Sequence, residues 1–182
     1  MGGMLGALIA SFVPAGGPSF EPIATATPTG TNTVTFNSVP STYKHLQIRV
    51  NAFVGTDAVL DMRFNGDSAG NYTQHGIFGR GASVAALGSP GTSTISILGG
   101  YDAMVPTFPN VSIIDIHDYA STTKNKTAKT FGGSVKNDTS TNLDVALTSG
   151  VWRNTAAVNS ITLFSGTNFT SGSVFSLYGI KG

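Results

Sequence analysis

The chain has 182 residues, a formal net charge of +1 and no cysteine, and only 10% of its residues are charged. The lack of cysteine excludes disulfides, thiolate nucleophiles and cysteine-based metal sites, and the near-zero net charge excludes a global basic field that would attract nucleic acid or an anionic membrane. The length suits one folded domain, and so few charges favour a surface that neighbouring subunits partly cover.

Residues 1–20 are predicted to form an extended N-terminal arm, with an apolar run over Met4–Val13. A run of about ten residues is too short to span a bilayer, which takes roughly 20. No Lys or Arg precedes the run, as one would in a secretory signal. We expect a partner subunit to hold the arm in place, with packing on its own domain as the alternative. The side chains expected to make this contact are Leu5, Leu8, Ile9, Phe12 and Val13.

Short strand signals separated by turn residues follow along the rest of the chain. The clearest is Tyr43–Val54, where Leu46, Ile48 and Val50 alternate with polar residues, as in a sheet with one face on a core and one on water. Gly79–Thr92, which is rich in Gly, Ala and Ser, is predicted to be a loop. The other predicted strands are Glu21–Thr27, Asn32–Val39, Val59–Asn65, Tyr72–Gly79, Ser93–Leu98, Asn110–Tyr119, Lys126–Val135, Asn142–Trp152, Asn159–Phe164 and Ser173–Ile180.

This succession of short strands predicts an all-β fold. No window carries the apolar spacing of a helix without Gly or Pro, and no repeat of propeller or solenoid length is evident. We therefore predict a two-sheet antiparallel sandwich over residues 21–182, specifically a jelly roll, behind the extended N-terminal arm.

The chain contains no enzyme motif: it has neither a phosphate-binding loop nor a nucleophile elbow. We therefore predict no catalytic, cofactor-binding or metal-binding residue and expect a protein that is not an enzyme. Asp115 and His117 share one face of a predicted strand and could approach an ion, but the wet side of a sheet is the preferred interpretation. Asp61 and Asp67 flank a turn and could contribute to a calcium site, but turn formation is the preferred interpretation of these acids.

Two further groups have a structural and a functional interpretation. Lys124 and Lys126 are predicted to lie on a solvated hairpin, with contact to an acidic subunit or an anionic glycan as the alternative. Trp152 is predicted to close a core, with sugar stacking beside Arg153 as the alternative.

Several segments over residues 43–182 resemble, in order, a family of short structural proteins in tailed-phage genomes that are often labelled tail or virion proteins. The resemblance does not cover the arm, and it implies a virion component without catalytic residues. The segments are Tyr43-Lys44-His45-Leu46-Gln47-Ile48-Arg49, Arg63-Phe64-Asn65-Gly66-Asp67, Asp115-Ile116-His117-Asp118-Tyr119, Trp152-Arg153 and Phe175-Ser176-Leu177-Tyr178-Gly179-Ile180-Lys181.

Together these observations lead us to expect a non-enzymatic structural protein on the outer surface of a tailed-phage particle. The first expectation is a capsid decoration (cement) protein, a homotrimer anchored by its arm to a neighbouring subunit or to the major capsid protein. The alternative is a tail-fibre or receptor-binding module that recognises host glycans through loops such as Gly79–Thr92 or Ser165–Gly172. Neither nucleic acid nor a membrane is an expected partner.

Overall fold

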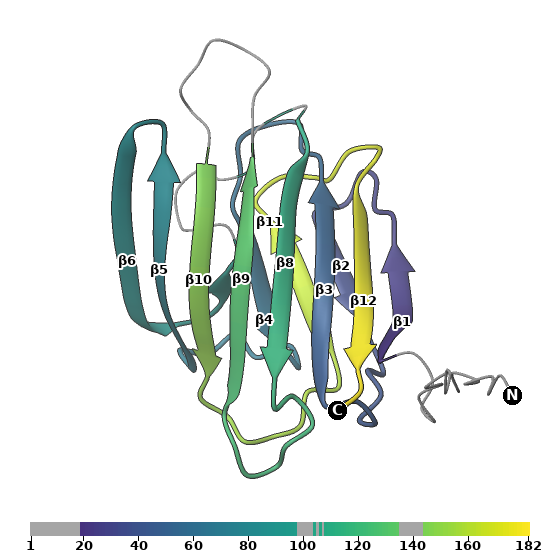
Figure 1. Cartoon of the computed structure of the whole chain (residues 1–182). Coiled ribbons are helices and arrows are strands. Elements are labelled where there is room, and N and C mark those ends of the chain that lie inside the picture. The colour runs from purple at the N-terminus through teal and green to yellow at the C-terminus, as the bar shows by residue number, and fades with distance from the viewer. Residues whose placement is uncertain (1–18, 98–103, 105, 107, 135–143) are drawn as a thin grey trace, which may run out of the picture.

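The computed structural model describes residues 19–97, 104, 106, 108–134 and 144–182, which form two antiparallel sheets packed face to face (Figure 1). The larger sheet has eight strands in the order β1-β12-β3-β8-β9-β10-β5-β6, and the smaller has four in the order β2-β11-β4-β7. Within these described ranges, no helix is long and apolar enough to cross a membrane. The strands are β1 (Phe20–Ala26), β2 (Thr33–Phe36), β3 (His45–Ala52), β4 (Leu60–Phe64), β5 (Tyr72–Arg80), β6 (Ser83–Thr92), β7 (Ile95–Ser96), β8 (Asn110–His117), β9 (Lys126–Ser134), β10 (Asp144–Trp152), β11 (Ile161–Ser165) and β12 (Val174–Ile180).

The prediction of an all-β, two-sheet antiparallel sandwich is confirmed. The chain passes between the sheets repeatedly, because β1, β3 and β5 belong to the larger sheet while β2 and β4 belong to the smaller. The arm residues Leu5, Leu8, Ile9, Phe12 and Val13 lie outside the described residues, so their partner-binding role stays a prediction.

The prediction of a loop over Gly79–Thr92 is wrong. The segment contains the end of β5 and the whole of β6, paired in register from Arg80 opposite Ser83 to Thr73 opposite Pro90, with a register shift before Tyr72 opposite Thr92. Gly81, with φ 54°, supplies the positive backbone angle of the connecting turn. Backbone pairing to β5, rather than an alternating pattern, makes this segment a strand. The strand predicted over Ser93–Leu98 is reduced to Ile95–Ser96, and Leu98 lies outside the described residues.

The core lies between the smaller sheet and the middle of the larger one. On β3, Leu46 and Ile48 are fully buried, as their alternation predicts. Leu60 and Met62 on β4 and Ile161 on β11 are also fully buried. These side chains point inward at every second position, which is how two stacked sheets share one apolar layer.

Residues 128–134 of β9 and 145–150 of β10 reverse this pattern, because their buried positions carry small or polar side chains. Thr130, Thr148 and Gly150 face inward. The inner face must be small here because the segment Ile95–Ile97 lies close to it. A Cβ added to Gly150 would lie 2.7 Å from Ile95 Cγ2, and Thr130 Oγ1 donates a hydrogen bond to the Ile97 carbonyl at 2.8 Å.

One corner of the larger sheet joins the two ends of the described body. The Lys181 N–H donates to the Ser19 carbonyl at 3.0 Å, and the Lys181 ammonium forms an ion pair with Glu21. The Tyr43 hydroxyl donates to Glu21 Oε2 at 3.0 Å. The Tyr43 ring lies directly on Gly179, where an added Cβ would fall 2.3 Å from the ring. Two of the segments that carry the phage resemblance therefore meet here.

A second structural centre forms around the turn at Asn65 and Gly66, which have φ values of 52° and 68°. The Asn65 Oδ1 accepts hydrogen bonds from the N–H groups of Asn159 and Ser160, which ties the turn to the approach to β11. The Trp152 indole donates to Asp67 Oδ2 at 2.7 Å. Trp152 is buried, as expected for a side chain that closes a core.

Candidate functional site

The outer face of the larger sheet carries exposed apolar side chains that have no cover within the described chain. We call this surface the apolar stripe. Its members range in exposed fraction from 43% for Ile113 to 81% for Val84. The apolar stripe consists of Val111, Ile113, Phe131, Val145, Leu147, Ile77 and Val84.

The strand register aligns these residues in two adjacent rows across β8, β9, β10, β5 and β6, which are neighbours in Figure 1. The rows lie two residues apart along each strand, so all their side chains point to the same face. The first row is Ile113, Phe131, Leu147, Ile77 and Ala86. The second row is Val111, Gly133, Val145, Gly79 and Val84.

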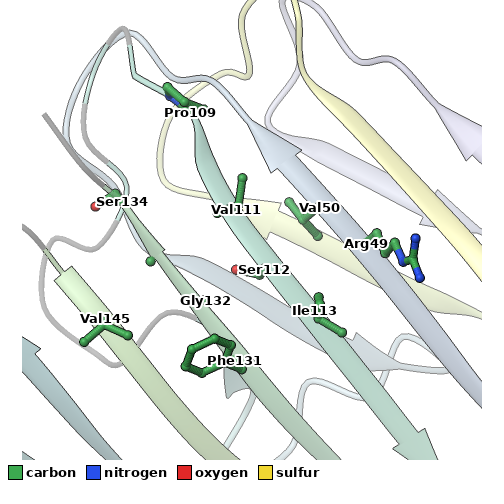
Figure 2. Close-up of a pocket in the computed structure, with 11 residues that line it drawn as sticks. Arg49, Val50, Pro109, Val111, Ser112, Ile113, Phe131, Gly132, Ser134 and Val145 are labelled. Carbon is green, nitrogen blue, oxygen red and sulfur yellow. The ribbon is translucent and has the colours of Figure 1, made fainter. Parts of the chain in front are cut away.

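Glycines hollow the second row into two grooves. The larger has a volume of about 540 Å³ and is lined by Val111, Ile113, Phe131 and Val145, which Figure 2 shows on β8, β9 and β10. Gly133, which lacks a side chain, lies between Val111 and Val145 in the register. The smaller, of about 330 Å³, lies across Val145 from the first, where Gly79 separates Val145 from Val84. Valines and glycines therefore alternate along this row.

Charge is sparse among the described residues that line the grooves, although Asp115 and Lys129 lie in the next row of the same face. Among the described residues that line the larger groove, Arg49 is the one with a charged side chain. Its guanidinium lies over the rings of Phe20 and Tyr178, 5.1 and 5.3 Å from their centroids. These rings belong to β1 and β12, on the far side of β3 from the stripe. An apolar ligand that enters the grooves therefore displaces almost no water bound to charged groups.

The other half of the same face is polar and holds the predicted Asp115 and His117 pair. Asp115 Oδ1 accepts a hydrogen bond from Gln47 Nε2 at 2.8 Å. His117 packs edge to face against His45, with ring centroids 4.8 Å apart. Burial lowers the pKa of His45, and the neighbouring His117 adds to this effect. Within the described ranges, no group of three or more potential metal-ligating side chains occurs.

The two predicted turn carboxylates have separate partners. Asp61 accepts a hydrogen bond from Thr94 Oγ1 at 3.3 Å, and burial raises the pKa of its carboxyl group. Asp67 accepts from Asn71, Trp152 and the Ala69 N–H, and the side-chain hydrogen bonds lower its pKa. Asp67 therefore uses its oxygens to hold the turn and the Trp152 indole in place.

The predicted shared solvent face of Lys124 and Lys126 is wrong, because Lys126 is fully buried. Its ammonium donates to the carbonyls of Lys124, Thr155 and Asn154 at 2.6, 2.9 and 3.4 Å. Burial lowers the pKa of this ammonium group. Lys126 thus joins the β8–β9 and β10–β11 connections, whereas Lys124 is exposed and pairs with Asp118 at 3.2 Å.

Sequence reasoning missed the apolar stripe, although the chain carries a signal for it. On β10, Val145 and Leu147 alternate with Ala146 and Thr148. Periodicity alone would assign the larger, apolar residues to the core. Where every second residue of a strand is small, that face can be the one on which another segment packs closely. The large residues then lie on the opposite, outer face.

No protein-family model, curated protein or solved structure matches this chain. The apolar stripe is therefore interpreted from its own residues and geometry. The tailed-phage resemblance stays a prediction.

Proposed function

We propose that this protein is a non-enzymatic structural subunit that associates with copies of itself, and that the apolar stripe is its assembly surface. One observation carries the proposal: over residues 128–134 of β9 and 145–150 of β10 the outer face carries the large apolar side chains and the inner face the small or polar ones. Phe131, the largest member of the stripe, is 57% exposed, while Thr130 beside it on β9 is buried.

Exposed apolar surface is costly to hydrate, and association that covers it is favourable. Each Å² of apolar area removed from water contributes about 25 cal/mol, so a contiguous stripe of half-exposed aliphatic and aromatic side chains stabilises any complex that covers it. Single exposed apolar residues are common on monomers, whereas the largest contiguous apolar patch on a protein surface is often functional. The scarcity of charge in the chain supports the same proposal, since charge is what keeps a monomer from associating.

The assembly that we propose is a tailed-phage particle, as the resemblance of residues 43–182 implies. There the protein would be a decoration subunit on the outer surface, a trimer in contact with the major capsid protein or another virion protein. Four residues of the segments that carry the resemblance have structural roles in the fold, as expected for motifs that hold a structural protein together. They are Tyr43, Gly179, Asn65 and Asp67.

The test compares two substitutions on one strand and one face. Phe131→Gln places an amide in the apolar stripe, and Lys129→Gln places the same amide two residues away on the polar half of the face. Sedimentation velocity of the full chain over a concentration series should show self-association that Phe131→Gln weakens at least tenfold and Lys129→Gln leaves unchanged. A wild-type chain that stays monomeric at its highest soluble concentration, or equal association by the two variants, would refute the proposal.

A further inference from the structure

We propose that the apolar stripe is occupied by the N-terminal segment Leu5–Val13 of an adjacent copy of this chain. This inference rests on the proposed assembly function and names the part of the partner that fills the surface. The support comes from the chemistry, relief and size of the stripe and from the length of chain that precedes β1.

The chemistry of the segment matches that of the grooves. Residues 4–13 contain no charged side chain and carry Leu5, Leu8, Ile9, Phe12 and Val13. The grooves present aliphatic and aromatic side chains, and Arg49 is the one charged residue in the part of their lining that the structure describes. An uncharged segment can therefore enter the grooves without removing water from charged groups on itself.

The relief of the stripe suits separate apolar side chains rather than a flat face. Its hollows lie at Gly133 and Gly79, which are two strands apart, or about 9.6 Å at the usual strand spacing. Val145 stands between them, and the row of Phe131 and Leu147 forms one wall. Apolar side chains from a single segment can fill both hollows while its backbone passes over Val145.

The size of the stripe also favours a segment over a second sheet. From β8 to β6 it spans four strand steps, about 19 Å, and its two rows are only about 7 Å apart. Together with the side chains this covers roughly 300 Å², whereas a standard interface takes about 800 Å² from each partner. Residues 5–13 measure about 14 Å as a helix and about 30 Å when extended, which brackets the length of the stripe.

The point at which the described chain begins favours the segment of another copy. Phe20 lies in the same cross-strand row as Ile180, His45 and His117. Ile113 is the nearest stripe residue on β8, four residues along that strand and three strands across, about 20 Å away. Val13 and Phe20 are seven residue steps apart, which reach at most about 23–25 Å when fully stretched. A segment from the same copy would therefore reach only the near end of the stripe, through an almost fully extended linker, while one from an adjacent copy has no such limit.

Cysteine cross-linking tests the location and the source of the segment, because the natural chain contains no cysteine. Full-length Phe12→Cys is mixed with full-length Val145→Cys that carries an affinity tag, and the mixture is oxidised. The expected result is a disulfide-linked dimer that contains one chain of each kind. Thr35→Cys, on the outer face of the smaller sheet, is the matched control and should give at least tenfold less mixed dimer.

Equal yields with Val145→Cys and Thr35→Cys would overturn the inference. So would a Phe12→Cys/Val145→Cys double variant that forms only an intrachain disulfide at every concentration, since the segment would then bind its own copy.

Full-length substitutions separate this inference from the proposed function. Leu8→Gln with Phe12→Gln should weaken self-association at least tenfold, to the level of Phe131→Gln, and Ser11→Gln should not. If Phe131→Gln weakens association and the Leu8/Phe12 variant does not, the stripe is the assembly surface but the segment is not its ligand. If neither variant changes association, both proposals fail.

Discussion

Gly179→Ala tests the packing of the corner where the two ends of the described body meet. The new Cβ would lie 2.3 Å from Tyr43 Cγ and 2.4 Å from both Cδ atoms. Ordinary contact between carbon atoms is about 3.5–4.0 Å, so the ring would have to retreat by more than about 1 Å. Hydrogen bonds hold the residue at both ends, because the Tyr43 hydroxyl donates to Glu21 and its N–H donates to the Tyr119 hydroxyl.

Overpacking of this kind costs about 1–3 kcal/mol and occasionally more, and the double anchorage of Tyr43 points to the upper end, about 3 kcal/mol. For a domain of this size each kcal/mol lowers Tm by about 2–4 °C, so we expect a decrease of roughly 6–12 °C. Gly166→Ala is the matched control because no atom lies within 4 Å of its added Cβ. It should change the free energy of unfolding by less than about 0.5 kcal/mol.

Urea unfolding of a double-mutant cycle measures the clash directly. Tyr43→Ala removes the ring, so Gly179→Ala in that background should cost less than about 0.5 kcal/mol, which gives a coupling energy of about 2–3 kcal/mol. If Gly179→Ala is equally destabilising with and without the ring, the packing of Tyr43 on Gly179 is not the reason for glycine at this position.

Three further substitutions test polar side chains that hold parts of the fold together. Lys126→Met should lower the free energy of unfolding, measured with urea, by about 2 kcal/mol, because buried carbonyls lose their donor. Lys124→Met, at an exposed site, should change it by less than about 0.5 kcal/mol. Equal effects of the two substitutions would contradict the role of Lys126. Tyr72→Phe should cost about 1–3 kcal/mol at pH 7, because the hydroxyl accepts from the Phe64 N–H at 3.0 Å. Burial raises the pKa of Tyr72 to about 12. Between pH 10 and pH 12 the hydroxyl has lost its proton only in the unfolded state, so the stability of the wild type should fall over this range. A Tyr72→Phe variant whose stability falls equally steeply with pH would contradict this. Asp67→Asn should remove part of the acid-induced loss of stability, because hydrogen bonds lower the Asp67 pKa and its stabilisation is lost as the pH falls below 3.8; unchanged acid unfolding would argue against it.

The fold could be predicted from the sequence where large apolar residues face the core. On β3 the alternation of Leu46, Ile48 and Val50 identifies both the strand and its buried face, and the structure agrees. The smaller sheet presents side chains of ordinary size to this part of the larger one. Burial and hydrophobicity therefore follow the same period.

The pattern fails where a backbone approaches the sheet. On β10 the inner position at Gly150 must be small to admit Ile95, and on β9 Thr130 bonds the Ile97 carbonyl, so the apolar side chains of this region remain outside and periodicity indicates the wrong face. Gly79–Thr92 has no strong alternation because much of β6 is exposed at the edge of the sheet. Burial of Lys126 was equally unpredictable, because the carbonyls that bind its ammonium come from connections far apart in the sequence.

The corner that holds Ser19 beside Lys181 has a consequence for chain connectivity. Because the first and last described strands pair with each other, a short linker from Gly182 to Ser19 could close the body into a ring without moving a strand. The ring could then be opened at the exposed Gly166, between β11 and β12, to give a circular permutant with every strand pairing retained. In such a protein the N-terminal segment could be attached at a different corner, which would separate the position of the anchor from the architecture of the domain.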